Sequence, residues 1–218
     1  MKAGDPHHGQ AVLRTGTELA KARGAVILLH GRGASAEDIL GLSDAIELPG
    51  LAWLAPEAAG HVWLPGHFFQ PISDNEPWLS SALGVVDGLL GAIAAAGIPA
   101  ERTFLGGFSQ GACLAAEYAL RHPLRRGGVF VLSGSSLGQA GDPEADSLRP
   151  PGSFEGTPVI VSCGDPDPYF DAPSVRRTAA QFRQRGAAVQ ELYVSGLGHQ
   201  VSDEALELCR AAIESALG

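Results

Sequence analysis

Cysteine is scarce in this 218-residue sequence, and its spacing excludes the sites that cysteines most often build. Three are present, Cys113, Cys163 and Cys209. An odd number without a C-x-x-C pair predicts neither a disulfide framework nor a zinc site. We interpret all three as buried apolar thiols in a reducing compartment.

Positive charge is scarce as well. The sequence has 15 lysines and arginines against 24 aspartates and glutamates, which gives a formal charge of −9 at neutral pH. A surface this acidic repels phosphate backbones, and the pairs Arg125-Arg126 and Arg176-Arg177 are too short to form a basic patch. Nucleic acid is therefore not an expected partner.

Long apolar runs are also missing. The longest apolar stretch, near residues 83–98, is interrupted by Asp87 and several glycines and falls short of the roughly 20 residues that a membrane span needs. The opening residues, MKAGDP, lack the apolar core of a secretory signal. We expect a cytoplasmic protein with no membrane span, and the sequence indicates no particular oligomeric state.

Apolar side chains are nevertheless plentiful enough for a core. Hydrophobic residues make up 45% of the chain and charged residues 18%. This balance excludes intrinsic disorder of the whole chain and supplies a substantial interior. The length suits one domain, so we expect residues 1–218 to form a single domain.

Short apolar runs alternate with helical patterns along the chain. Strands are expected at 25–30, 51–55, 103–107, 129–133, 158–163 and 189–194, and helices from about 35, then at 76–97, 110–122, 172–185 and 203–217. This order predicts a mostly parallel sheet with helices on both faces. In such sheets, the chemistry lies in loops at the carboxyl ends of the strands. Two long loops, 57–75 and 134–156, are expected to be functional or mobile.

The sharpest motif is GFSQG at residues 107–111, which fits G-x-S-x-G between a predicted strand and a predicted helix. In a nucleophile elbow, the turn is so tight that glycines must stand two residues before and two after the serine. The turn presents the Ser109 hydroxyl above the sheet edge and aims the first N–H groups of the next helix at a developing oxyanion. Ser109 is therefore the predicted nucleophile.

A serine hydroxyl needs a general base, and in this architecture the chain order is serine, acid, histidine. His199 is the histidine that follows both Ser109 and the next acidic loop, and it lies in the GLGH loop before the last helix. The acid should follow the strand that ends near residue 164. Asp165 and Asp167 both stand there, and spacing alone does not choose between them. The one that does not orient His199 is expected to cap the loop or bind its own backbone.

The loop HGRGAS at residues 30–35 follows the first apolar strand. It is placed to supply a second oxyanion donor, the backbone N–H of Arg32, beside that of Gln110. The Arg32 side chain would suit a substrate carboxylate or phosphate, but a solvated surface arginine is the favoured interpretation.

The same loop supports a rival interpretation. Gly31, Gly33 and Ala36 fit the G-x-G-x-x-A dinucleotide fingerprint around Gly31-Arg32-Gly33, and Glu57 at the end of the next strand would hold a ribose. This alternative leaves the GFSQG motif and the Asp and His loops unexplained. A non-catalytic binding module on the same fold is a further alternative, although no triad member is missing from the sequence.

Apolar side chains in and beside the first long loop are the candidate substrate pocket. They are Trp63, Leu64, Phe68, Phe69 and Trp78. The pair His7-His8 is interpreted as an exposed, inert terminal pair, so neither a metal nor an organic cofactor is expected.

These motifs together resemble the phospholipase/carboxylesterase family of α/β-hydrolases, which includes acyl-protein thioesterases. The resemblance rests on LLHGRG at 28–33, GGFSQGA at 106–112, GDPDP at 164–168 and GLGH at 196–199. It implies an α/β-hydrolase fold without a large cap domain, and it favours Asp167 as the acid. Ala34 stands where acyl-protein thioesterases carry an aspartate, so the chain looks closer to the bacterial carboxylesterase branch.

The resemblance implies a serine carboxylesterase that acts on small to medium acyl or aryl esters. Ser109, His199 and Asp167 would form the triad, and the N–H groups of Arg32 and Gln110 would hold the oxyanion. An acyl-thioesterase or a lysophospholipase on the same triad is the alternative within this class. A small-molecule ester is the expected partner.

Overall fold

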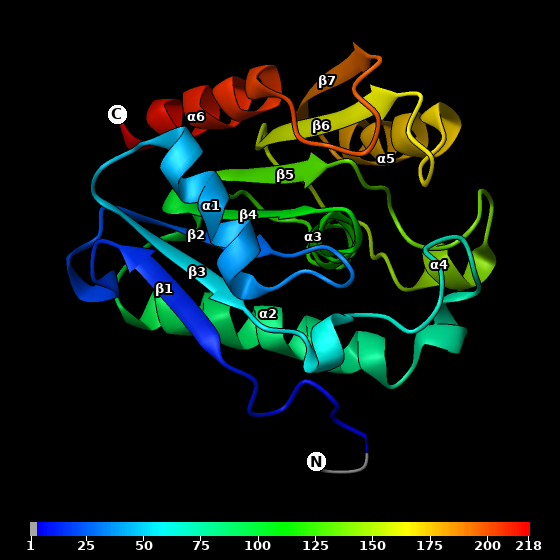
Figure 1. Ribbon diagram of the computed structural model, residues 1–218, viewed down its shortest axis with the longest axis horizontal. Coiled ribbons are helices and arrows are strands. Elements are labelled where there is room, and N and C mark those ends of the chain that lie inside the picture. The colour runs from blue at the N-terminus through cyan, green and yellow to red at the C-terminus, as the bar shows by residue number, and fades with distance from the viewer. Residues whose placement is uncertain (1–3) are drawn as a thin grey trace.

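The computed structural model describes residues 4–218, which build one seven-stranded sheet (Figure 1). The strand order is β1-β3-β2-β4-β5-β6-β7. The edge strand β1 runs antiparallel to β3, and the other neighbouring pairs are parallel. The strands are β1 (Val12–Gly16), β2 (Gly24–Leu29), β3 (Leu51–Pro56), β4 (Thr103–Phe108), β5 (Gly128–Leu132), β6 (Pro158–Asp165) and β7 (Ala188–Ser195).

Helices cover both faces of this sheet. They are α1 (Ala36–Ile46), α2 (Trp78–Ala95), α3 (Gln110–Arg121), α4 (Pro143–Ser147), α5 (Ala172–Gln184) and α6 (Asp203–Leu217). Buried residues of α2, α3 and α5 share one apolar cluster, and those of α1 and α6 share a second cluster. The predicted mostly parallel sheet with helices on both faces is therefore confirmed.

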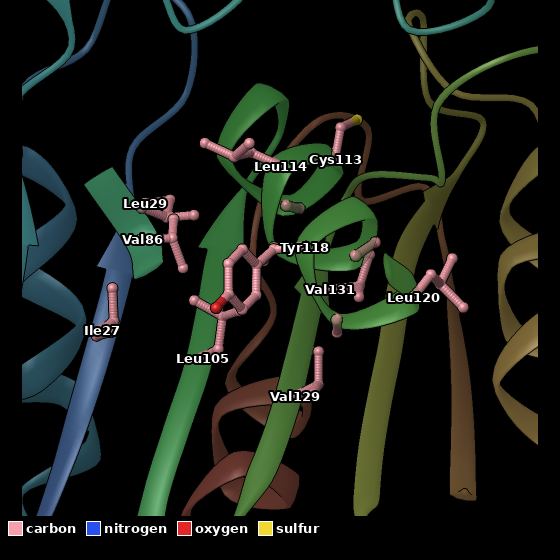
Figure 2. Packing of buried hydrophobic residues seen from close by; sticks show 14 of the residues in the cluster. Ile27, Leu29, Val86, Leu105, Cys113, Leu114, Tyr118, Leu120, Val129 and Val131 are labelled. Atoms are coloured by element: carbon pink, nitrogen blue, oxygen red, sulfur yellow. The ribbon is translucent and has the colours of Figure 1, made fainter. Parts of the chain in front are cut away.

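The two clusters arise because neighbouring residues of a strand point to opposite faces. In β2, Ile27 and Leu29 belong to the first cluster, whereas Val26 and Leu28 belong to the second. Figure 2 shows the first cluster, where strand residues such as Ile27 and Leu105 face the buried side chains of α3. A strand buried on both faces reads as an unbroken apolar run, which is why β2 is visible in the sequence.

Helix α1 begins with a capping box. The Ser35 side chain accepts a hydrogen bond from the Asp38 backbone N–H at 3.2 Å, and the Asp38 carboxylate accepts one from the Ser35 N–H at 2.8 Å. These bonds satisfy N–H groups that a helix start leaves unpaired. The N-terminus of α1 is thereby fixed next to the loop at residues 30–35.

Helix α2 covers the longest apolar stretch of the sequence. By length and composition it is the one helix among residues 4–218 that is long and apolar enough to cross a membrane. A helix that packs against a sheet has the same composition, and α2 buries Leu79, Val86 and Ile93 in the first cluster. The apolar character of α2 is therefore accounted for in part by core packing.

Candidate active site

The turn between β4 and α3 has the backbone of a nucleophile elbow. Ser109 has φ 55° and ψ −119°, a conformation that residues with side chains rarely adopt. A Cβ atom at Gly107 would lie 2.5 Å from the carbonyl carbon of Gly111, and one at Gly111 would overlap the carbonyl oxygen of Leu29. Both glycines are therefore required by the space available, and the Ser109 hydroxyl is lifted above the sheet edge.

The structure brings Ser109 into contact with the imidazole from the loop after β7. The His199 Nε2 atom lies 2.9 Å from Ser109 Oγ, and Nδ1 lies 2.7 Å from Asp167 Oδ2. The Asp167 side chain is fully buried, whereas that of His199 is 16% exposed. Hydroxyl, imidazole and carboxylate thus form one hydrogen-bonded line that opens to solvent at the serine end.

The geometry separates the two candidate acids. Asp167 Oδ2 faces His199, while Oδ1 accepts hydrogen bonds from the backbone N–H groups of Tyr169 at 2.8 Å and Phe170 at 3.1 Å. Asp165 is exposed, and its backbone carbonyl accepts a bond from Gly196. The expectation that the second aspartate caps the loop or binds its own backbone is wrong, because Asp167 both orients His199 and binds the loop backbone.

A buried thiol also contacts the carboxylate. Cys163 Sγ lies 3.6 Å from Asp167 Oδ2 and donates a weak hydrogen bond to it. Burial raises the pKa of the Cys163 thiol to about 12, so the sulfur keeps its proton at neutral pH. The Asp167 carboxylate therefore has four donors around it and little freedom to turn.

The candidate oxyanion donors lie beside Ser109 at the mouth of the site. Gly31, Arg32 and Gln110 line the same cavity as Ser109. Within residues 4–218, the backbone N–H groups of Arg32 and Gln110 donate to no backbone carbonyl. Both N–H groups are therefore available to an oxygen atom placed in the cavity.

The side chains of these two residues have a different task, since both hold the loop after β3. The Gln110 amide accepts from the Trp63 N–H and donates to the Leu64 carbonyl, each at 2.8 Å. The Arg32 guanidinium donates to the carbonyls of Leu64 and Gly66, each at 2.7 Å. Arg32 is exposed, as the sequence suggests, and these bonds use its Nη2 atom to hold the loop.

The cavity in front of Ser109 has a volume of about 340 Å³. Leu64 and Phe68 line it, as the sequence predicts for them. Tyr169 and Phe170 line it as well and pack against the His199 ring, with centroid distances of 4.8 and 5.8 Å. Their signal in the sequence is their place two and three residues after Asp167, because the loop that carries this acid also passes over the imidazole.

Three predicted pocket residues lie elsewhere. Trp63 is fully buried in the core, where its indole N–H donates to the His30 carbonyl at 3.0 Å. Phe69 is 48% exposed and packs on its neighbour Phe68, and Trp78 packs edge-on against His7. Aromatic composition identified the right loop, but it did not indicate which face of the loop each ring occupies.

His7 is not the exposed residue that the sequence suggests. Its side chain is buried, its Nδ1 accepts a bond from the Ala59 N–H at 3.1 Å, and its Nε2 lies 3.0 Å from the Trp63 carbonyl. Burial lowers the pKa of this imidazole. His7 is therefore a neutral bridge between the N-terminal segment and the loop after β3, whereas His8 is exposed.

The loop at residues 30–36 does not have the features of a dinucleotide site. The Glu57 carboxylate accepts a hydrogen bond from the Ala36 N–H at 3.0 Å, at the start of α1. A bound pyrophosphate would need that helix N-terminus, which the protein's own carboxylate already occupies. Among the residues described, no cluster of three histidines, cysteines or acids is arranged to hold a metal ion.

Comparisons with known proteins agree with this geometry. A family model described as phospholipase/carboxylesterase matches residues 13–217. The chain is 28% identical over 225 residues to acyl-protein thioesterase 1 of Eremothecium gossypii, covering 95% of this chain and 94% of that protein. It is 29% identical over 209 residues to a probable carboxylesterase of Oryza sativa subsp. japonica, covering 86% of this chain and 75% of the other.

A solved structure is also similar along nearly the whole chain. The crystal structure of a phospholipase/carboxylesterase from Dyadobacter fermentans superposes with a TM-score of 0.89 at 35% identity. The match covers 95% of this chain and 97% of that one. Fold and sequence thus point to the same group of proteins.

Proposed function

Because this chain belongs to the phospholipase/carboxylesterase family of serine hydrolases, we propose that it hydrolyses small to medium carboxylic esters at Ser109. The observation that carries the proposal is the unbroken line of hydrogen bonds from Ser109 through His199 to Asp167. Each member follows a different strand, so only the folded sheet assembles the three. The substrate is the acyl group that fits the cavity in front of Ser109.

Acylation follows from the positions of these atoms. The imidazole Nε2 accepts the Ser109 proton while Oγ bonds to the ester carbonyl carbon. When the tetrahedral intermediate collapses, the bond from that carbon to the alcohol oxygen breaks, and the same proton passes from Nε2 to the departing oxygen. Asp167 holds Nδ1–H toward itself and stabilises the imidazolium that forms.

Stabilisation of the oxyanion falls to the backbone. Arg32 and Gln110 line the cavity, and their N–H groups have no backbone acceptor among residues 4–218. Gln110 is also the first residue of α3, where the helix dipole favours negative charge. Loss of one such donor typically costs about 2.7–4 kcal/mol of the activation barrier. Water activated by His199 then attacks the acyl-enzyme and releases the acid.

The lining of the cavity indicates apolar acyl groups. Leu64, Phe68 and Phe170 form apolar walls, and the Arg32 guanidinium is bound to loop carbonyls. A volume of about 340 Å³ suits a short or medium chain or one aryl ring. We therefore expect butyrate and hexanoate esters to be better substrates than palmitate esters.

An acyl-thioesterase activity on the same triad is the second candidate. It is favoured by the similarity to acyl-protein thioesterase 1 of Eremothecium gossypii along almost the whole of both chains. Esters and thioesters share the acyl-enzyme intermediate, so they differ only in the group that leaves. Matched butyryl esters and thioesters of one alcohol and its thiol would distinguish the two activities by their kcat/KM values.

The proposal is tested by hydrolysis of an ester series with Ser109→Ala as the control. We expect turnover of the wild-type protein to be greatest at short to medium acyl lengths, and we expect Ser109→Ala to lose about 10³-fold or more of kcat. A folded wild-type protein that hydrolyses none of the series would indicate a non-catalytic binding module. A Ser109→Ala variant that retains full turnover would place the nucleophile elsewhere.

A further inference from the structure

A second cavity lies on the other side of His199. Its volume is about 420 Å³, and it lies between α1 and the loop that carries the imidazole. Gly31, Ala34, Phe108 and His199 line both cavities, so these four residues form the ridge that the cavities share. The second cavity thus adjoins the proposed reaction centre.

The two cavities differ in the reacting groups that they present. Ser109, Arg32 and Gln110 line only the first, whereas His199 lines both. During acylation, the carbonyl carbon must reach Ser109 and its oxygen must reach the two backbone N–H groups, so the acyl part lies in the first cavity. The departing oxygen must instead reach His199, which returns the proton. The group attached to that oxygen is therefore directed toward the cavity that presents His199 without Ser109.

Two of the four residues shared by the cavities, Gly31 and Ala34, are small. A Cβ atom at Gly31 would lie 3.3 Å from Ser109 Cβ and 3.4 Å from the Phe108 ring, so a side chain at this position would crowd the nucleophile. Ala34, the other small residue of the ridge, adds a single methyl group. Larger side chains at these two positions would add bulk where the two cavities meet.

The walls of the second cavity define the chemistry of its occupant. Ile39 and Leu42 of α1 face Val201 from the loop before α6, and all three are aliphatic. The one ionised side chain at this cavity is Asp38, whose pKa is lowered by hydrogen bonds from Ser35. The walls therefore favour apolar groups, and the Asp38 carboxylate repels anionic ones.

We propose that this second cavity, lined by Ile39, Leu42 and Val201, binds the alcohol part of the substrate. The proposal rests on the proposed ester hydrolysis at Ser109 and adds the identity of the leaving group. That group is an apolar alcohol without negative charge, such as a medium-chain alkyl alcohol. Thioesters of large polyanionic carriers are correspondingly disfavoured.

The test compares hexyl butyrate with methyl butyrate, because both share one acyl group and their alcohols have similar intrinsic reactivity. Leu42→Trp fills the second cavity, and Leu40→Trp is the matched control, since Leu40 lies on α1 and packs in the second cluster outside the cavity. We expect wild type and Leu40→Trp to share one hexyl-to-methyl ratio of kcat/KM. Leu42→Trp should lower that ratio about tenfold.

A second filling variant, Val201→Phe, narrows the same cavity from the opposite wall and should also lower the ratio. Thermal unfolding shows whether each filling variant folds. If either Leu42→Trp or Val201→Phe does not fold, the hexyl-to-methyl ratio of the other variant decides the test. An unchanged ratio in the folded variants overturns the proposal for the second cavity. If wild-type Ser109 hydrolyses neither ester, the proposed function itself fails, which is a distinguishable result.

The charge of the cavity is tested with Asp38→Asn, which retains an oxygen acceptor for Ser35. The probes are the butyrate esters of choline, a cation, and of glycolic acid, an anion. We expect the substitution to lower the choline-to-glycolate ratio of kcat/KM by about threefold at low ionic strength. An unchanged ratio would overturn the part of the proposal that assigns Asp38 a role in selecting the alcohol.

Discussion

At the scale of single residues, the site depends on Ser109 and also on two glycines beside it that have no side chain. Ser109 takes a positive φ because the chain must turn sharply between β4 and α3. Neighbouring backbone fills the space where side chains would stand at Gly107 and Gly111. The two glycines of the G-x-S-x-G pattern are therefore required by packing, which is why the motif could be recognised in the sequence.

A methyl group at Gly111 tests this packing. Because it would overlap the Leu29 carbonyl, we expect Gly111→Ala to lower the free energy of unfolding by about 1–3 kcal/mol and to abolish ester hydrolysis. Gly41→Ala is the control, since a Cβ atom at this exposed position of α1 meets nothing within 4 Å. Urea denaturation measures the free energy of unfolding of both variants. A Gly111→Ala variant as stable as the wild type would contradict this packing requirement.

The two aspartates after β6 offer a matched pair of substitutions. Asp167→Asn removes the carboxylate that faces His199 Nδ1, so we expect kcat for butyrate esters to fall about 10³- to 10⁴-fold. Asp165→Asn changes an exposed side chain two residues away and should leave kcat within about twofold. Equal losses in the two variants, or a larger loss in Asp165→Asn, would reverse the assignment of the acid.

At the scale of elements, the long loop at residues 134–156 is tied to α3 by a buried ion pair. The Glu117 carboxylate is fully buried and contacts Arg149 from the loop and Arg121 from its own helix. Arg149 also donates to the Leu137 carbonyl at 2.7 Å, so it fixes two parts of the loop at once. The loop was expected to be functional or mobile, and these contacts show a structural anchor.

Breaking this pair should destabilise the protein without touching the reaction centre. Arg149→Met leaves the buried Glu117 with one partner, and we expect the free energy of unfolding to fall by about 3 kcal/mol. Arg125→Met is the control, because Arg125 is exposed and its side chain binds, among residues 4–218, just the Glu155 carbonyl. This substitution should cost less than about 1 kcal/mol. Equal stability of the two variants in urea would contradict a structural role for the pair.

Most of these elements could be predicted from the sequence, and the missed ones share a physical cause. Strands such as β2 and β5 are buried on both faces, so their apolar runs are unbroken. Edge strand β1 is half exposed, and its sequence VLRTG has no such run. Helix α4 spans five residues, too few for a helical period to appear.

The residues of the site also divide into those that the sequence predicts and those that it does not. The strand-end motifs locate Ser109, His199 and the acidic loop, because parallel topology brings those ends to one edge of the sheet. The burial of Trp63 was not predictable, since it depends on bonds to Gln110 and His30, far away in the chain. The position of a loop ring depends on such contacts, and composition does not report them.

At the scale of the whole molecule, two buried histidines link stability to pH. Burial lowers the pKa of His7 and of His30, whose ordinary value is near 6.5. Below that pH the unfolded chain binds protons that the folded chain does not, so stability is lost as the pH falls through about 6.5 and is constant above it. Each histidine adds a slope of up to about 1.4 kcal/mol per pH unit.

Denaturation at several pH values checks this linkage. We expect the free energy of unfolding to fall between pH 7.5 and pH 5.5, and His7→Gln to reduce the size of that fall. The exposed neighbour gives the control, so His8→Gln should behave as the wild type does. A wild-type stability that does not change over this range would contradict the burial of both imidazoles in neutral form.

The central claim is that Ser109 is a nucleophile activated by His199, and covalent labelling tests it most directly. The protein is treated with a fluorophosphonate, digested, and the modified peptide is identified by mass. We predict one adduct on Ser109, none in Ser109→Ala, and labelling slowed by at least about 10²-fold in His199→Ala. An adduct on a different residue, or a His199→Ala variant that labels at the wild-type rate, would contradict the claim.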